Sequence, residues 1–255
     1  MKILLMIYDA VFYILILLFI LIIIGAYFYL IKKPQEKVSI KDLYAEGLDM
    51  LVTGQRKSAY RKFKEIINQD SNNVKAYLHL GQVMREGGNV TQALKIHTNL
   101  LHRRDLSSYE KIELYKNLVF DYEKLNNSIQ AVKYCDKILQ LDKKNEWAMK
   151  YLIKLYKNQD DWTNAIESLK AYLKLKKQDN NHMLALYNIQ RGRSVLKNGD
   201  YTKSRQIFEN VLELDSDMFI SYYFLGNTYK EESNFIFNKS IEVKEDNSGS
   251  LENNE

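Results

Sequence analysis

The sequence has 255 residues, of which 27% are charged and 46% are hydrophobic, and its formal net charge at pH 7 is +5. This length accommodates one helical-repeat domain of roughly 200 residues together with an anchor and a tail. The modest charge is interspersed with acidic residues, so we predict no nucleic-acid partner. The single cysteine, Cys135, excludes an internal disulfide framework and a zinc site of the Cys-x-x-Cys kind.

The first predicted element is a membrane-spanning helix. Residues 11–31 carry no charge, and about 21 residues at 1.5 Å per residue span roughly 30 Å, the thickness of a bilayer core. A cleaved signal peptide is the alternative, but Gly25-Ala26-Tyr27 is a poor cleavage site. We therefore predict a retained single-span anchor over residues 1–33, followed by a linker over residues 34–42.

Flanking charge predicts the orientation of this anchor. Only Lys2 and the acidic Asp9 precede the span, whereas four lysines follow it, at positions 32, 33, 37 and 41. Positively charged flanks stay in the cytoplasm, so the rest of the chain is predicted to be cytoplasmic. Asp9 is either an interfacial residue or a polar contact for a partner membrane helix.

The next predicted element is a set of helical hairpins. Gly47 and Gly81 lie 34 residues apart, and each is followed at matching distances by a second glycine and an alanine. Such a period with small residues at fixed places is typical of tetratricopeptide (TPR) hairpins, where small residues let two helices cross closely. The same places are filled further along the chain by Ala131, Ala165, Gly192, Gly199, Ser204 and Gly226.

The fold class is therefore predicted to be all-α, with the N-terminal transmembrane helix followed by a TPR solenoid. We assign residues 43–237 to the solenoid, as five repeats and a degraded sixth. Helix ends are predicted at Gly54, Gly88, Asn126 and Gly199, and a capping box at Ser107–Glu110. Residues 238–255 are polar and lack a core stripe, so the sequence predicts a disordered tail.

Motifs for chemistry are missing from the sequence. It contains no phosphate-binding loop and no dinucleotide-binding glycine pattern, and its four histidines lack paired ligand spacing. His97 occupies a place where the repeat carries an aromatic residue, so it is interpreted as a packed core histidine making one hydrogen bond. We predict that the protein is not an enzyme and that it has no cofactor and no metal.

The remaining candidate for function is a protein-binding groove lined by the first helix of each repeat. Within it, the spacing of Lys150, Lys154 and Lys157 places three lysines on one helix face, where they could hold an acidic segment or a peptide carboxylate. A solvated helix face is the alternative interpretation. The predicted groove residues are Gln82, Arg85, Lys116, Trp147, Lys150, Lys154, Lys157, Arg193 and Lys197.

Several segments resemble the lipopolysaccharide assembly protein B family. The most specific is Ile96-His97-Thr98-Asn99-Leu100-Leu101, which is preceded by a Gly-x-x-x-Arg-x-x-Gly segment at residues 81–88 and followed by Asp105-Leu106-Ser107. Residues 161–166 (Asp-Trp-Thr-Asn-Ala-Ile) and residues 44–48 (Tyr-Ala-Glu-Gly-Leu) also look like that family. The resemblance covers most of the chain.

The resemblance implies a bacterial inner-membrane anchor and a cytoplasmic TPR adaptor. The family couples a membrane AAA+ protease to the deacetylase that commits lipid A synthesis, and so regulates lipopolysaccharide synthesis. Its members end in a rubredoxin-like zinc module with two Cys-x-x-Cys pairs, whereas this chain ends in a polar tail. A zinc site is therefore not carried over.

Two other interpretations stay open. The chain could be a general TPR scaffold of another cell-envelope assembly complex, with the resemblance reflecting repeat ancestry alone. RNA binding at the membrane surface is a third hypothesis, and it would require an RNA affinity that falls steeply with salt. Exposed surface in the degraded sixth repeat is a candidate for self-association into a homo-oligomer.

Overall fold

The computed structural model describes residues 2–31 and 38–252, which form α-helices and no strand. The predicted all-α class is confirmed. Helix α1 (Lys2–Ile31) contains the apolar segment Val11–Tyr29, whose 19 residues have a mean hydropathy of 3.0 and none of which is buried in the structure. This helix is long and apolar enough to cross a membrane.

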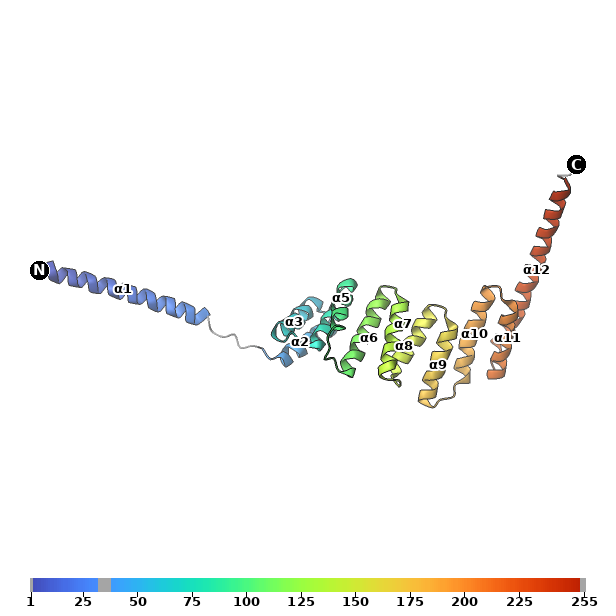
Figure 1. Cartoon of the computed structure of the whole chain (residues 1–255), viewed down its shortest axis with the longest axis horizontal. Helices are drawn as coiled ribbons and strands as arrows, with labels where there is room; N and C mark the ends of the chain where they lie inside the picture. The colour runs from blue at the N-terminus through green and yellow to red at the C-terminus, as the bar shows by residue number, and fades with distance from the viewer. Residues whose placement is uncertain (1, 32–37, 253–255) are drawn as a thin grey trace.

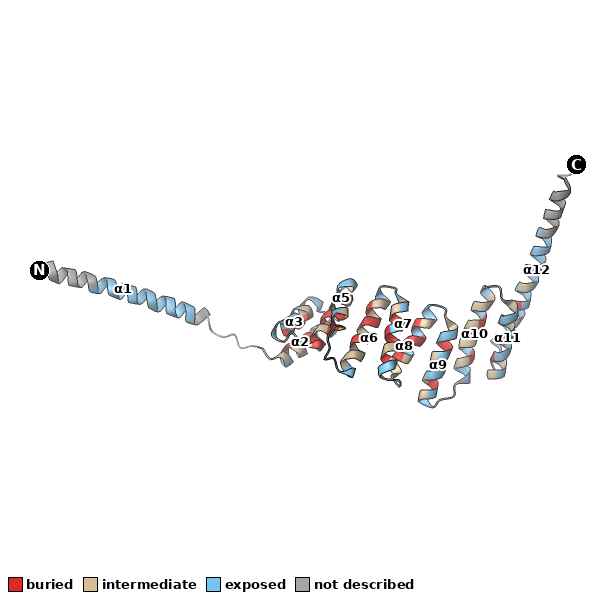
Figure 2. Ribbon diagram, in the orientation of Figure 1, coloured by how far each residue is buried: buried red, intermediate tan, exposed pale blue. Residues whose placement is uncertain are grey.

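The helices from α2 to α11 form five antiparallel hairpins that follow one another in a row (Figure 1). The hairpins are α2 (Ile40–Val52) with α3 (Arg56–Gln69), α4 (Val74–Glu86) with α5 (Val90–Leu100), α6 (Ser108–Lys124) with α7 (Ser128–Leu141), α8 (Glu146–Asn158) with α9 (Trp162–Lys176), and α10 (Asn181–Lys197) with α11 (Tyr201–Leu214). A single helix, α12 (Ile220–Glu252), follows the last hairpin. Buried residues run through the middle of the row, where each helix meets its neighbours (Figure 2).

The two helices of each hairpin meet at a pair of residues in a fixed register. In three hairpins a glycine on the first helix faces a large ring on the second, and a Cβ added to Gly47, Gly81 or Gly192 would lie 3.1, 2.3 or 2.5 Å from that ring. The facing rings are Phe63, His97 and Phe208, respectively. In the other two hairpins the same register holds the pairs Val119 with Cys135 and Ile153 with Leu169, all of them buried. A glycine is thus matched by a large ring, whereas aliphatic or thiol side chains of intermediate size pair with one another, and both solutions fill the space between the helices.

Four helix ends lie where the sequence predicts them. Gly54, Gly88, Gly199 and Asn126 adopt positive φ angles just after helix ends, which only glycine and asparagine tolerate well. At the start of α6, the Ser107 side chain accepts a hydrogen bond from the Glu110 backbone N–H, and the Ser107 N–H donates to the Glu110 carboxylate. The predicted capping box is therefore confirmed.

The predicted end of the linker and the predicted start of the tail do not coincide with helix boundaries in the structure. Residues 34–37 of the predicted linker lie outside the described residues, and the end of that linker, from Ile40, already belongs to α2. At the other end, α12 continues to Glu252 through most of the segment for which composition predicts disorder. Backbone hydrogen bonds within a helix need no tertiary partner, so a helix anchored by packing at Ser221 and Thr228 can extend past its last contact. The domain limits themselves stay predictions.

Cys135 is fully buried between α6 and α7, and this burial raises the pKa of its thiol to about 12. Because the thiolate is the reactive form, we expect the folded chain to resist alkylation by iodoacetamide at about pH 8, and the urea-unfolded chain to react readily. Mass spectrometry of the alkylated protein measures both rates. Equal rates in the two states would contradict the burial of this thiol.

Candidate partner-binding surface on the first helices

An aromatic cluster bridges the first helices of the third and fourth hairpins. The Trp147 and Tyr151 rings of α8 are stacked with centroids 4.7 Å apart, and the Phe120 ring of α6 packs edge-on against them at 5.6 and 5.5 Å. The Lys116 ammonium lies 5.5 Å from the Trp147 ring centroid. Trp147 and Lys116 were predicted groove residues, and the structure brings them together.

Glu123 of α6 links this cluster to the lysines of α8. Its carboxylate accepts hydrogen bonds from the Tyr151 hydroxyl and from the Lys154 ammonium, the latter at 2.6 Å. Burial raises the pKa of Glu123, but the hydrogen bonds from Lys154 and Tyr151 outweigh this and lower it below its usual value. Burial and the bond to Glu123 raise the pKa of Tyr151, so its hydroxyl stays a donor.

The three lysines of α8 surround one hollow of about 250 Å³, which we call the lysine hollow. Lys150 and Lys157 are exposed, and their ammonium groups lie over the rings of Tyr172 and Tyr187 at 5.2 Å. The lining is completed by Ile153, Lys154, Asn158 and Tyr187. An apolar floor with several ammonium groups at its rim suits a peptide carboxylate or an acidic side chain.

The other predicted groove residues lie away from this hollow. Gln82 donates a hydrogen bond to Glu86 on α4. Arg193 and Lys197 of α10 line a separate hollow of about 400 Å³, where the Arg193 guanidinium lies 5.3 Å from the Phe224 ring. The predicted residues on α6 and α8 thus form one central group. Those on α4 and those on α10 lie apart from it and from one another.

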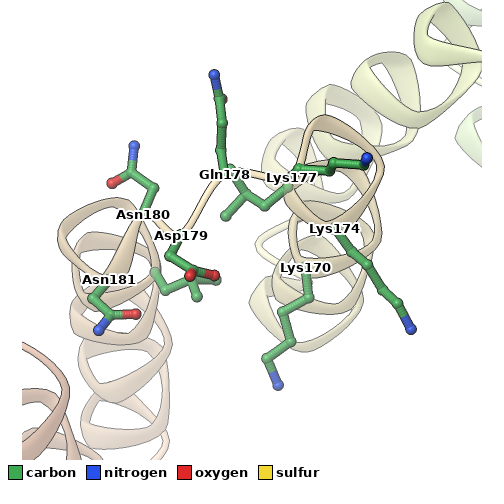
Figure 3. Close-up of a pocket in the computed structure, with 9 residues that line it drawn as sticks. Lys170, Lys174, Lys177, Gln178, Asp179, Asn180 and Asn181 are labelled. Carbon is green, nitrogen blue, oxygen red and sulfur yellow. The ribbon is translucent and has the colours of Figure 1, made fainter.

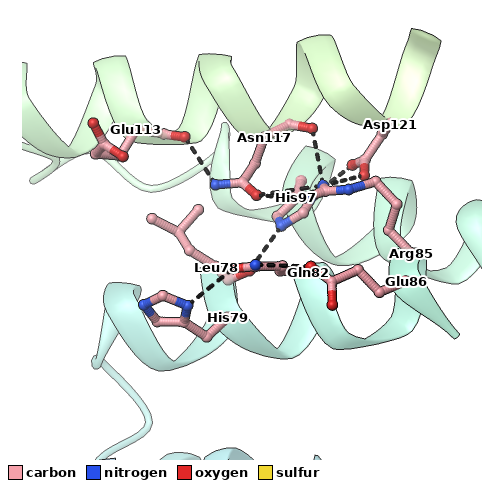
Figure 4. A network of polar contacts seen from close by, with 9 residues as sticks. All are labelled: Leu78, His79, Gln82, Arg85, Glu86, His97, Glu113, Asn117 and Asp121. Atoms are coloured by element: carbon pink, nitrogen blue, oxygen red, sulfur yellow. Dashed lines mark hydrogen bonds and ion pairs between the residues drawn. The ribbon is translucent and has the colours of Figure 1, made fainter. Parts of the chain in front are cut away.

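Arg85 is placed differently from the rest, because only 9% of its side chain is exposed. It donates a hydrogen bond to Asp121 of α6 at 2.8 Å and further bonds to Asn117 (Figure 4). Its guanidinium is therefore directed at the junction of the second and third hairpins, which leaves little of it for a partner. A role for Arg85 in a groove stays a prediction.

His97 shares the same carboxylate. Its Nδ1 lies 2.5 Å from an Asp121 carboxylate oxygen and its Nε2 lies 3.2 Å from the Leu78 carbonyl oxygen (Figure 4). The sequence places His97 in the core with one hydrogen bond, whereas the structure gives it two. Both neighbours of the imidazole are hydrogen-bond acceptors. Arg85, His97 and Asp121 form a buried charged network, which we call the junction network.

A second group of lysines lies at the turn between α9 and α10. Lys170, Lys174 and Lys177 line a hollow of about 460 Å³ together with Asp179 and Asn180 (Figure 3). Figure 3 shows their side chains spread in different directions around the turn. This group has the same number of lysines as the lysine hollow but lacks its aromatic floor.

These helical hairpins, with complementary residues at a fixed register, define a TPR solenoid. A tetratricopeptide repeat protein from Parabacteroides merdae has a solved structure that matches with a TM-score of 0.50 at 17% identity, over 80% of this chain and 78% of that one. This likeness supports the fold alone. No protein-family profile matches the chain.

Two curated proteins are similar to this chain in amino-acid sequence. The chain is similar to lipopolysaccharide assembly protein B of Escherichia coli strain K12, with 24% identity over 146 residues. It is also similar to the TPR repeat-containing protein MJ1428 of Methanocaldococcus jannaschii, with 24% identity over 241 residues. The matched parts are 57% and 87% of this chain, but only 38% and 41% of those two proteins. The resemblance to lipopolysaccharide assembly protein B is therefore confirmed over about half of the chain.

Proposed function

We propose that this protein is a membrane-anchored TPR adaptor that regulates lipopolysaccharide synthesis by bringing the lipid A deacetylase to a membrane AAA+ protease. The lysine hollow supports the proposal from the side of the structure, since its ammonium groups suit an acidic segment of a protein. The similarity to lipopolysaccharide assembly protein B supports the choice of pathway. Neither curated relative is named for an enzymatic activity, in keeping with a binding role.

The mechanism we propose is tethering. Helix α1 would confine the solenoid to the cytoplasmic face of the bacterial inner membrane, as the lysines after the span favour. Confinement raises the effective concentration of the solenoid near a membrane protease without any new contact. The lysine hollow and the aromatic cluster would then hold the client. A carboxylate of the client would pair with Lys150 and Lys157, while Lys154 stays bound to Glu123.

The test of this function is the half-life of the lipid A deacetylase after translation is blocked, in cells with and without the protein. A longer half-life without the protein is the expected result. An unchanged half-life would favour the second candidate, a general TPR scaffold of another cell-envelope assembly complex. The aromatic cluster is compatible with that candidate too, because aromatic side chains anchor many kinds of protein interface.

A separate prediction concerns the contribution of the lysine hollow to client capture. Reversing Lys150, Lys154 and Lys157 to glutamate is expected to weaken capture of the client at least tenfold, because an attractive rim becomes repulsive. Photo-crosslinking in membranes and titration with the purified deacetylase measure the capture. The helix content should stay unchanged, since all three lysine side chains are exposed and the only ion pair lost is the surface pair of Lys154 with Glu123.

The matched control has the same change of charge at the other lysine group. The variant Lys170→Glu, Lys174→Glu, Lys177→Glu alters the turn between α9 and α10 and leaves α8 untouched (Figure 3). It should capture the client as the native chain does. Equal weakening by both variants would show that net charge, rather than the lysine hollow, determines the capture.

A further inference from the structure

Helix α12 presents an uncovered face at the place where the other first helices meet their hairpin partner. Gly226 follows Gly192 by 34 residues, one repeat further along the chain. A Cβ added to Gly192 would lie 2.5 Å from the Phe208 ring, whereas a Cβ added to Gly226 would meet no atom of the described chain within 4 Å. In the hairpins, the residue at this register position contacts the second helix. At the same position in α12, Gly226 is covered by no atom of the described chain.

This open face carries a regular stripe of large and small residues. Tyr222, Tyr229 and Ile236 recur every seven residues and are 61%, 57% and 61% exposed. Four residues after each comes a small one, so that both sets lie on one face of the helix. The small residues are Gly226, Ser233 and Ser240. A hollow of about 440 Å³ runs along this stripe, lined by Tyr229, Ser233, Ile236 and Ser240 among others.

The neighbouring face of α12 is already used. Ser221 is buried and its hydroxyl donates to the Phe208 carbonyl at 2.6 Å, while Phe224 stacks on the Phe208 ring. Glu232 accepts a hydrogen bond from Arg205 of α11. The stripe therefore lies beside the surface that docks α12 on the last hairpin, and it projects along the helix past that hairpin (Figure 1).

We propose that the stripe binds the same stripe of a second copy of this chain, with the two α12 helices antiparallel. In that arrangement Ile236 packs opposite the partner's Ser233, and Tyr229 packs opposite the partner's Ser240. Tyr229 and Ile236 then each meet a serine, much as a large ring meets a glycine in three of the hairpins. A parallel pair would place large residues against large ones and small against small, which leaves the helices badly matched.

Charge favours the same register. Glu232 and Lys239 lie one heptad apart on one edge of the stripe. An antiparallel pair places Lys239 opposite the partner's Glu232, and the two-fold symmetry repeats the contact. Arg205 already binds Glu232, so the carboxylate would sit between two cations. In the parallel alignment Glu232 and Lys239 of different copies are too far apart along the helices to pair.

Engineered cysteines test the register in the full chain, purified in mild detergent. Differently tagged Ser233→Cys and Ile236→Cys chains are mixed and oxidised, and disulfide-linked dimers are separated on a non-reducing gel. The native thiol of Cys135 is buried and does not interfere. We expect a crosslink between the two variants and little within either one. A crosslink of Ser233→Cys chains to themselves would indicate a parallel pair and overturn the proposal, as would no crosslink.

Measuring the oligomeric mass of the native protein and of one variant completes the test. Light scattering should give twice the chain mass for the native protein and once for Ile236→Glu, which puts a charge into the stripe. The control Asn234→Glu adds the same charge at an exposed position outside the stripe and should stay dimeric. A monomeric native chain would overturn the proposal. A dimer that survives Ile236→Glu would place the interface elsewhere, in the anchor for example, and would overturn it too.

Discussion

Replacing Asp121 with alanine is expected to lower the free energy of unfolding by about 3–5 kcal/mol, the largest effect of any single change we predict. Asp121 is fully buried, and its two oxygens accept hydrogen bonds from Arg85 and His97. Removing the carboxylate leaves two donors buried with no anion between them, and each must be desolvated without compensation. Urea unfolding of the full chain in detergent, followed by circular dichroism, measures the loss.

The control for this prediction is an ion pair of the same chemistry at the surface. Glu167 and Lys170 are joined at 3.0 Å but are 66% and 55% exposed. The variant Glu167→Gln should change the free energy of unfolding by less than about 1 kcal/mol, because water replaces the lost contact. A similar loss in both variants would mean that burial does not determine the cost at Asp121.

A rescue variant separates the role of charge from that of shape. The register occupied by His97 holds phenylalanine in the first and fifth hairpins, as Phe63 and Phe208. The triple variant Arg85→Leu, His97→Phe, Asp121→Leu should therefore recover most of the stability lost in Asp121→Ala, since apolar groups can replace a buried charged network. Failure to recover would show that the network also fixes the geometry between the second and third hairpins.

Most of the solenoid can be predicted from local sequence. The period between Gly47 and Gly81, the glycines after helix ends and the Ser107–Glu110 capping box all act within one hairpin. Their effect depends on residues that are near one another along the chain. The fold class follows from such signals because each repeat solves the same local packing problem.

The contacts between hairpins are harder to predict. The sequence does not point to Asp121, because nothing near it along the chain shows that it faces Arg85 and His97 from the previous hairpin. The contact of Phe120 with the aromatic cluster is hidden for the same reason. The place of Trp147 in the repeat predicts it, and Tyr151 lies four residues further along α8 on the same face, a spacing that is a usable signal in the sequence. Phe120 joins these two rings only when neighbouring first helices pack side by side.

The lysine hollow can be predicted from the sequence only in part. The spacing of Lys150, Lys154 and Lys157 places them on one face, and the structure shows that they share one hollow. The floor of that hollow includes Tyr187 from the next hairpin, which spacing within α8 could not reveal. Helix periodicity thus predicts which charges lie together, while packing between repeats decides what lies beneath them.

The second large effect is expected at Gly192. An alanine there would place its Cβ 2.5 Å from the Phe208 ring, which is fully buried, so the ring or a helix would have to shift. We expect Gly192→Ala to lower the free energy of unfolding by about 2 kcal/mol, because overpacking outweighs the gain in helix propensity. Urea unfolding of the full chain in detergent measures it.

The matched control is the same substitution one repeat later. Gly226 has the same register, but an added Cβ meets no atom of the described chain within 4 Å. In the monomeric Ile236→Glu chain, Gly226→Ala should therefore raise stability by about 0.5–1 kcal/mol through helix propensity alone. The double variant Gly192→Ala, Phe208→Leu should regain part of the loss, since the fourth hairpin fills this register with Ile153 and Leu169. Equal effects of the two glycine substitutions would show that the facing ring does not set the requirement for glycine, and that the solenoid accommodates a larger residue by shifting a helix.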